Sequence, residues 1–335
     1  MTAQPFHAPG PGNASQGLAV VVPVRDGAST LSACLEALVP DLPVDGEVFV
    51  VDDGSRDASV EIATGWIERS GASDRVHVLR MDRPRGPSAA RNAGWRATDR
   101  PLVAFVDADV MVRPGALARL VAALEADPWL LGANGMLDPE PGAEGLVSAF
   151  VNTSLRYQHL RHGPRVASAF TSLCVLRRQA LVAMGGWDER RPGRYADDVA
   201  TRFVLPIRTL ARVPEATGIH RKEVTLGGLL KHRSNVGYHF VASMAEQVPS
   251  PSRAVLGWRY PMNTALAAAS IAAVAIGPAG LPVGGGIVAT SALVNARFVL
   301  HSLRHRNVSE ALAAWPLSAL EGFAYLVGMA RSFGP

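Results

Sequence analysis

Apolar and polar residues follow two rhythms along the first part of the chain. Leu18–Val24 and Glu47–Val51 are nearly continuous apolar runs, which is typical of strands covered on both faces. Apolar residues between these runs recur at the helical spacing i, i+3, i+4, i+7, namely Leu31, Cys34, Leu35 and Leu38. Pro40 ends this pattern. The pattern predicts a strand–helix–strand unit.

The same alternation continues toward residue 106. It predicts helices at 58–69 and 88–97 and strands at 76–80 and 102–106. Strands that alternate with helices favour an α/β fold with a Rossmann-like, doubly wound and mostly parallel sheet. Ligands of such sheets bind beyond the carboxyl ends of the strands, so functional residues are expected there.

The C-terminal region has a different pattern, because no charged residue occurs between Tyr260 and Ala296. Gly277–Pro282 divides this stretch into two arms of about 26 Å each, at ~1.5 Å per residue, slightly short of a ~30 Å hydrocarbon core. Within a hydrophobic helical region at 255–335, we expect a transmembrane or re-entrant hairpin at 260–296 and a third apolar helix at 311–330. A soluble Ala-rich helical subdomain is the alternative.

Composition narrows the class of protein. The net charge of +4 is almost entirely due to arginine, since Lys222 and Lys231 are the only lysines. The arginines are scattered and form no basic helix with interleaved aromatics, which argues against nucleic-acid binding. Cys34 and Cys174 both lie in apolar contexts and are predicted to be buried thiols of a reducing compartment. Residues 1–17 lack the apolar core of a secretory signal and are predicted to be a flexible leader.

Four clusters carry candidate chemistry, and the first two fit a nucleotide. In Asp52-Asp53-Gly54-Ser55, a carboxylate can accept hydrogen bonds from a base or a ribose, although capping of the next helix is an equal alternative. In the small-residue turn Gly86–Gly94, a nucleotide can approach the backbone at Gly86, and Arg91 can face phosphates. A solvated helix face is the alternative for Arg91.

The third cluster is Asp107-Ala108-Asp109, directly after the predicted strand 102–106. Two neighbouring carboxylates repel each other unless a cation neutralises them. Hard oxygen ligands favour Mg²⁺ or Mn²⁺, which a diphosphate could share. Two solvated loop acids are the alternative.

The fourth cluster begins with Gly185-Gly186-Trp187-Asp188-Glu189 and continues with Asp197-Asp198. A carboxylate could deprotonate an acceptor hydroxyl, and a second carboxylate beside it would raise its pKa. Trp187 offers a flat face for a sugar ring. The alternatives are a helix cap at Asp197 and a core position for Trp187.

Taken in order, these clusters resemble the family 2 glycosyltransferases of GT-A fold over about residues 18 to 245. The matching segments are Val22-Pro23-Val24, Asp52-Asp53-Gly54-Ser55, Gly86 to Gly94, Asp107-Ala108-Asp109, Gly185-Gly186-Trp187-Asp188-Glu189 and Asp197-Asp198. A nicotinamide-dependent dehydrogenase is disfavoured, because Arg25–Ser29 contains no Gly-x-Gly-x-x-Gly turn.

The resemblance implies a role for each matching position. The nucleobase would be bound near Pro23, Val24, Asp52 and Asp53. Asp107 would meet the ribose or the metal, and Asp109 would be the principal ligand of Mg²⁺ or Mn²⁺. The donor sugar and the acceptor would lie near Trp187, Asp188, Glu189 and Asp197. Asp198 would be the catalytic base of an inverting single displacement.

Three departures from the family pattern refine these expectations. Asp197 stands where the family usually has Glu, which shortens the side chain beside the base. Arg25 or Asp26 occupies the position of a frequent Asn near the nucleobase. The Gln-x-x-Arg-Trp motif of processive polysaccharide synthases does not occur, so non-processive transfer is expected.

Basic residues follow the expected base. His232 and Arg233 could form a cationic lid on the diphosphate, or a basic segment that leads to the membrane part. His220 is a candidate metal or phosphate contact. The basic segment 297–306 should lie on the cytoplasmic side of a bacterial membrane, together with the catalytic domain at 18–245.

The expected function is therefore a membrane-associated inverting hexosyltransferase. It would move a sugar from a nucleotide-diphosphate sugar, with UDP-sugars favoured, to a hydroxyl acceptor that could be a lipid or a small metabolite. A polyprenyl-phosphate sugar synthase is the alternative enzyme. A non-catalytic nucleotide-binding membrane scaffold is the alternative from another class.

Overall fold

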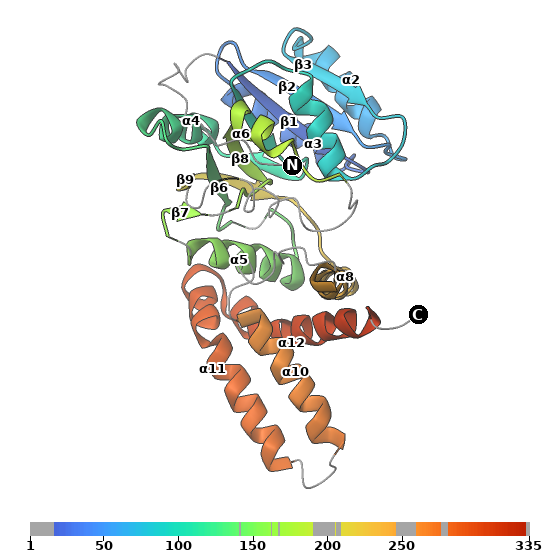
Figure 1. Ribbon diagram of the computed structural model, residues 1–335, viewed down its shortest axis with the longest axis vertical. Helices are drawn as coiled ribbons and strands as arrows, with labels where there is room; N and C mark the ends of the chain where they lie inside the picture. Colours follow the sequence, from blue (N-terminus) through green and yellow to red (C-terminus); the bar gives the residue numbers. More distant parts are fainter. Residues whose placement is uncertain are drawn as a thin grey trace. The chain divides into compact units, whose positions relative to one another are not determined.

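The computed structural model describes residues 17–140, 142–161, 163–166, 168–189, 205, 209–245, 259–275 and 281–332. The chain divides into two compact units. The α/β unit comprises residues 1–140 and 162–221, and the helical unit comprises residues 141–161 and 222–335 (Figure 1). This division differs from the expected boundary near residue 245. The expected leader lies outside the described residues, except for Gly17.

The α/β unit is built on one mixed sheet, which has nine strands within the described residues. The strands are β1 (Leu18–Val24), β2 (Glu47–Asp52), β3 (Val76–Arg80), β4 (Leu102–Val106), β5 (Val110–Val112), β6 (Gly132–Leu137), β7 (Arg165–Val166), β8 (Leu173–Arg177) and β9 (Leu210–His220). Their order is β3-β2-β1-β4-β8-β6-β9-β5, with β7 paired to β9. The β3-β2-β1-β4 half is parallel, whereas β8 runs antiparallel to both β4 and β6.

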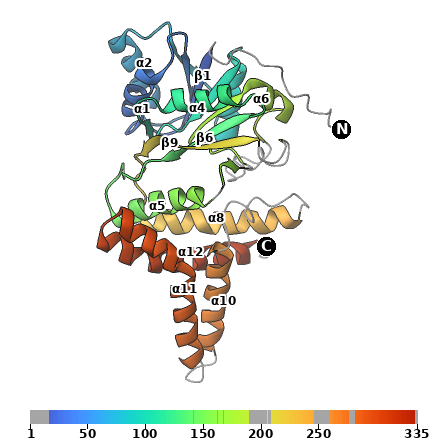
Figure 2. The same ribbon diagram turned by 90° about the vertical axis from the view of Figure 1, so that its left-hand side faces the viewer.

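Helices flank this sheet (Figure 2). They are α1 (Leu31–Leu38), the 3-10 turn η1 (Val39–Asp41), α2 (Ser59–Ser70), α3 (Pro87–Arg96), α4 (Ala116–Ala126) and α6 (Arg178–Met184). The strands and helices predicted between residues 18 and 106 are confirmed. The continuous apolar runs form β1, which is buried except for Pro23, and β4, which is fully buried. The helical pattern forms α1, whose apolar face is buried.

Close packing of α3 against β1 brings the second polar cluster to the sheet edge. A Cβ atom added at Gly94 would lie 2.4 Å from Cγ1 of Val21, so only glycine permits this approach. Both cysteines are buried free thiols, as predicted. The core of the unit joins residues from β1, β4, β8 and the turn after α6, with Phe105 and Trp187 in edge-to-face contact at 5.2 Å.

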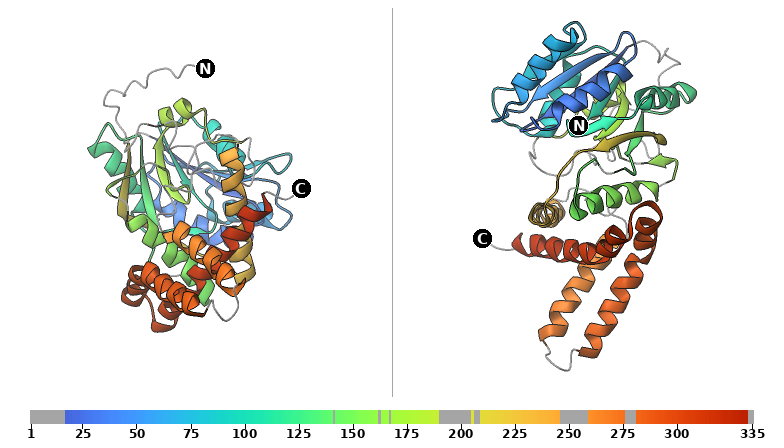
Figure 3. Two further views of the ribbon diagram at one scale, coloured as in Figure 1. Left: turned by 60° about the horizontal axis from the view of Figure 1, so that its bottom comes forward. Right: turned by 180° about the vertical axis from the view of Figure 1, so that it is seen from behind.

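The helical unit contains α5 (Leu146–Leu160), α8 (Leu226–Ala245), α10 (Arg259–Ala275), α11 (Leu281–His305) and α12 (Val308–Arg331). In this unit α5, α8 and α12 lie together, and α10 and α11 leave them as a pair of neighbouring helices (Figure 3). Its core consists of Phe150, Leu229, Phe298, Ala314 and Leu317. The predicted apolar helix at 311–330 is therefore α12.

Two helices are long and apolar enough to cross a membrane by length and composition. They are Pro282–His305 and Val308–Arg331, with mean hydropathies of 1.5 and 1.2. At 17 residues, α10 is shorter than either. The C-terminal region thus contains apolar helices suited to membrane association.

Candidate active site

Asp107 lies where β4 ends and is held from two sides. The Arg91 Nη2 atom donates to Asp107 Oδ1 at 2.9 Å, and the Ser172 hydroxyl donates to Oδ2 at 2.6 Å. Antiparallel pairing of β8 with β4 brings Ser172 to this position. Arg91 is buried, so the alternative of a solvated helix face is excluded. The carboxylate of Asp107 therefore holds the Arg91 side chain of α3 near Asp109, the predicted metal ligand.

Asp109 follows in the turn between β4 and β5. The pairing of β5 with β9 places Val110 opposite His220, and the backbone N–H of Arg221 donates to the Asp109 carbonyl at 2.7 Å. The His220 Nε2 atom lies 3.6 Å from Asp109 Oδ1. Two residues that are far apart in sequence therefore present an oxygen and a nitrogen ligand at one edge of the sheet.

A divalent cation could bind at this edge if a bound ligand supplied its remaining coordination positions. Asp109 and His220 would hold the ion, because both carboxylate oxygens of Asp107 already accept hydrogen bonds from protein side chains. Among the described residues, no group of three or more His, Cys, Asp and Glu side chains is placed to hold a metal ion, so Asp109 and His220 would need further ligands from a bound substrate. An open site of this kind leaves ligand positions for a diphosphate.

Negative charge at this edge also affects its neighbour Cys34. The pKa of the Cys34 thiol is raised far above its usual value, first by burial and then by the charges of Asp109 and Asp107. The thiol therefore stays protonated. It contributes no charge to the site.

Asp52 and Asp53 organise the turn after β2. Asp52 is buried and accepts a hydrogen bond from the Ser55 backbone N–H at 3.0 Å. Asp53 is 3% exposed, and its two oxygens accept from the backbone N–H groups of Arg85 at 2.6 Å and Gly86 at 2.8 Å. The carboxylate of Asp53 thus holds the loop that enters α3. Its contact with a nucleobase remains a prediction.

The end of β1 lies beside this turn. The Asp53 backbone N–H donates to the Val24 carbonyl at 2.8 Å, which aligns the ends of β1 and β2. Pro23 is partly exposed, and Gly86 has φ = 94°, a left-handed conformation that favours glycine. Pro23, Val24, Asp53 and Gly86 are therefore brought together, as the proposed nucleotide site requires.

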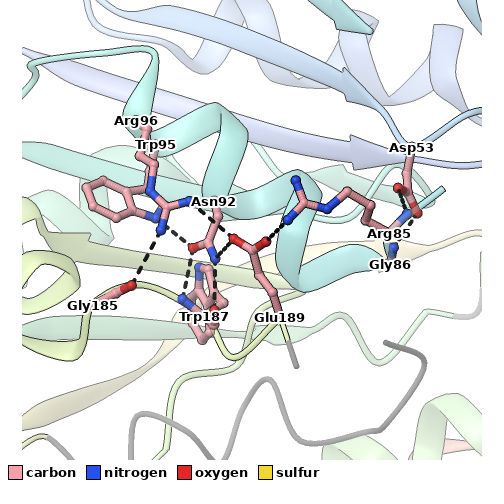
Figure 4. A network of polar contacts seen from close by, with 9 residues as sticks. All are labelled: Asp53, Arg85, Gly86, Asn92, Trp95, Arg96, Gly185, Trp187 and Glu189. Atoms are coloured by element: carbon pink, nitrogen blue, oxygen red, sulfur yellow. Dashed lines mark hydrogen bonds and ion pairs between the residues drawn. The ribbon is translucent and has the colours of Figure 1, made fainter. Parts of the chain in front are cut away.

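Asn92 connects α3 to the Gly185–Glu189 turn (Figure 4). Its Nδ2 atom donates to the Trp187 carbonyl at 2.8 Å and to Glu189 Oε1 at 2.6 Å. Its Oδ1 atom accepts from Trp95 Nε1 and from the Trp187 backbone N–H, each at 2.8 Å. Because the Asn92 side chain is buried, this amide anchors the turn to α3.

Glu189 is further held by two arginines. Arg85 forms an ion pair with Glu189 Oε2, and Arg96 Nη1 lies 3.2 Å from Oε1. Arg85 also donates its backbone N–H to Asp53, so one residue links the two turns (Figure 4). Asn92, Arg85 and Arg96 were not predicted as site residues from the sequence. Their placement depends on long-range pairing, which no local pattern signals.

Trp187 is a core residue and does not present a platform for a sugar. It is 2% exposed and contacts Phe105 edge to face. Both faces of its ring are therefore withdrawn from a ligand, and the core position considered as the alternative is correct. Asp188 is partly exposed in the same turn. Asp197 and Asp198, the predicted acceptor contact and base, lie outside the described residues.

His232 and Arg233 belong to α8 of the helical unit. The Arg233 Nε atom lies 2.5 Å from Glu321 Oε1, and both side chains are buried. Burial, with the neighbouring charges of Arg233 and Lys222, lowers the pKa of His232 to about 3. The imidazole is thus neutral and the guanidinium has a carboxylate partner, so these contacts do not support a cationic lid.

Comparisons with known proteins bear on the family and the fold of the chain. Residues 19–181 match the sequence family described as glycosyl transferase family 2. The succinoglycan biosynthesis protein ExoU of Rhizobium meliloti is 33% identical over 33% of this chain and 30% of its own length. The pre-mycofactocin glycosyltransferase of Mycobacterium tuberculosis is 29% identical over 68% of this chain and 48% of its own length. The chain thus spans less than half of these relatives.

Solved structures share the fold. A mannosyltransferase from Pyrobaculum calidifontis, solved with GDP-Man and Mn²⁺, is 19% identical over 94% of this chain and 86% of its own, with a TM-score of 0.57. Glucosyl-3-phosphoglycerate synthase from Mycobacterium tuberculosis, solved with Mn²⁺, UDP-glucose and glycerol 3-phosphate, is 19% identical over 74% of this chain and 88% of its own, with a TM-score of 0.50.

The sheet and these likenesses define an α/β fold of the GT-A type. The chain carries a glycosyltransferase domain that belongs to family 2, over residues 19–181.

Proposed function

We propose that this protein is a membrane-associated inverting glycosyltransferase that uses a nucleotide-diphosphate sugar and a divalent cation. The observation that carries the proposal is the edge where Asp109 and His220 lie 3.6 Å apart beside the Arg91–Asp107 ion pair. Acid, imidazole and guanidinium groups at one sheet edge are the complement of a metal–diphosphate. The domain match and the fold support the same class.

Residue roles follow from these contacts. Asp109 and His220 would hold Mg²⁺ or Mn²⁺, which would offset charge on the leaving diphosphate. Arg91, oriented by Asp107, would lie near the phosphates. The turn held by Asp53 would border the nucleobase, for which we favour uracil. Asp198 would take the proton of the acceptor hydroxyl, with Asp197 beside it.

Exposed apolar residues on α11 and α12 favour a lipid acceptor and a position at the cytoplasmic face of a bacterial membrane. A polyprenyl phosphate combines a lipid chain with an oxygen nucleophile, so a polyprenyl-phosphate sugar synthase is the second candidate. In the first candidate function, the acceptor is instead a lipid or small metabolite that carries a hydroxyl group.

A panel of sugar nucleotides with Mn²⁺ tests the proposal. Full-length protein in bacterial lipid vesicles should release nucleoside diphosphate from one donor, with UDP-sugars tested first. Radiolabel in the lipid extract would identify a lipid acceptor, and mild-acid lability of that product would identify a sugar phosphate. Asp198→Asn protein should bind the donor but not turn it over. Metal-dependent nucleotide binding without turnover of any donor would instead indicate a scaffold.

A further inference from the structure

The outward face of α12 is apolar along the helix. Leu312, Leu320 and Val327 are 69%, 39% and 55% exposed. No charged residue occurs on α12 between Glu310 and Arg331 except Glu321, which is buried. Within the described residues, no element of the helical unit covers this stripe. A continuous apolar face of this kind requires an apolar environment.

The opposite face of α12 is joined to α8 too closely for the two helices to separate. A Cβ atom at Gly328 would lie 1.7 Å from the Ser234 carbonyl oxygen, and one at Gly237 would lie 2.1 Å from that of Tyr325. The buried Arg233–Glu321 ion pair connects the same two helices. Both helices must therefore occupy the same environment.

This pairing opposes a transmembrane path for α12. A spanning α12 would take α8 into the bilayer, including the exposed Lys231. A lysine near the centre of a membrane is strongly disfavoured, and the neighbouring polar residues of α8 would add to this cost. Length and hydropathy alone allow α12 to span, but its partner helix does not.

The pair α10 and α11 has the opposite character. Leu293 and Val288 on α11 are 76% and 54% exposed, and no charged side chain occurs between Tyr260 and Ala296. The two helices run side by side and extend away from the other helices of their unit (Figures 1 and 3). The composition of this uncharged stretch permits insertion into hydrocarbon, and Arg297 of α11 follows directly after it.

We propose that α12 lies in the plane of the membrane interface, with the Leu312, Leu320 and Val327 stripe against the acyl chains, while α10 and α11 enter the bilayer. This inference rests on the membrane association proposed above and specifies how the helical unit meets the lipid. Arg304 and Arg331 are exposed at the C-terminal ends of α11 and α12. In the proposed arrangement, they would form ion pairs with anionic lipid headgroups.

Spin-label depth measurements test this arrangement. Single cysteines at Leu312, Leu320 and Val327 would be labelled in full-length protein reconstituted into phosphatidylcholine–phosphatidylglycerol vesicles. Leu293→Cys reports on α11, and Val44→Cys, which is 96% exposed in the α/β unit, is the aqueous control. The native Cys34 and Cys174 are buried, so they should not react with the label.

The expected result is the same shallow depth at all three α12 positions, a greater depth at Leu293 and an aqueous signal at Val44. From 312 to 327 a helix rises about 22 Å, so a spanning α12 would give a depth that peaks near Leu320 and falls on both sides. That profile would overturn the proposal, and so would an aqueous signal at all three positions. Because depth is read without turnover, loss of glycosyl transfer would leave this result unchanged.

Discussion

The two units of this protein distribute polarity in opposite ways. In the α/β unit the central strands form an apolar core, the buried polar side chains Asp53, Arg91 and Asn92 lie toward one edge of the sheet, and Asp107 and Asp109 are partly exposed there. In the helical unit the interior contains the polar pairs Arg233–Glu321 and Asn263–Asn295, while large apolar side chains of α11 and α12 face outward. The outward-facing apolar side chains of the second unit agree with the membrane association proposed above.

This contrast also assigns different tasks to the acidic residues of the two units. Asp109 can be replaced with little loss of packing, because it lies at an open edge. Glu321 is enclosed between α8 and α12 and forms a buried ion pair with Arg233. Activity should therefore depend on the first acid and stability on the second.

The largest expected effect is that of Asp109→Asn. Loss of a metal-binding carboxylate should reduce transfer at least about 100-fold, since even indirect partners of metal ligands commonly cost 10–100-fold. The melting temperature should stay close to that of wild type. Nucleoside diphosphate release measures the first effect and circular dichroism the second. Asp74→Asn, at an exposed turn, is the control; equal activity of both variants would remove Asp109 from the site.

Glu321→Gln should be the most destabilising change in the helical unit. It leaves the Arg233 guanidinium buried without its carboxylate, which typically costs about 3–5 kcal/mol. Denaturant unfolding in detergent micelles would measure the loss. The matched Arg233→Met/Glu321→Leu variant, which removes both charges, should recover most of it. A loss below about 1 kcal/mol for Glu321→Gln would show that the pair does not hold α8 against α12.

Asn92→Ala should cost about 1–3 kcal/mol, because it leaves buried Trp95 and Trp187 groups without their hydrogen-bond partner. It should also lower kcat more than the affinity for the donor, since it loosens the turn that carries Glu189. Arg96→Ala is the control, because this half-exposed arginine contributes under about 1 kcal/mol to the same turn. Equal effects of the two variants would contradict a central role for Asn92.

The smallest expected effect concerns Asn263 and Asn295, whose side-chain amides exchange hydrogen bonds at 2.9 and 3.3 Å between α10 and α11. Hydrogen bonds between membrane helices contribute on average about 0.6 kcal/mol. A double-mutant cycle with Asn263→Ala and Asn295→Ala should give a coupling of this size in micelles. No measurable coupling would mean that packing alone joins the pair.

The first half of the sheet could be predicted from sequence because each strand or helix there has a local signature. Continuous apolar runs predicted β1 and β4, and the spacing of Leu31 to Leu38 predicted α1. The antiparallel strands β8 and β9 could not be predicted in this way, because their partners lie far away in sequence. The same limit explains the positions of Ser172, Asn92 and Arg85.

Individual residues show most clearly what local sequence patterns could not predict. Trp187 occurs in a motif that also contains polar residues, so its sequence context suggested a ligand contact, yet the tertiary fold buries it against Phe105. Arg233 occurs in a basic run, but its partner Glu321 comes from the last helix. Residue type and local order indicated which segments carry candidate chemistry. The side chains that hold it in place became visible only through pairing across the fold.

Calorimetric titration of the full-length protein with UDP and GDP, with and without Mn²⁺, tests the central claim most directly. If the edge formed by Asp109, His220 and the Arg91–Asp107 pair is a metal–diphosphate site, Mn²⁺ should tighten binding of one nucleotide at least about tenfold, or ~1.4 kcal/mol. The gain should disappear in Asp109→Asn protein and persist in Asp74→Asn protein. Nucleotide affinity that is independent of Mn²⁺, or a gain that survives Asp109→Asn, would contradict the account.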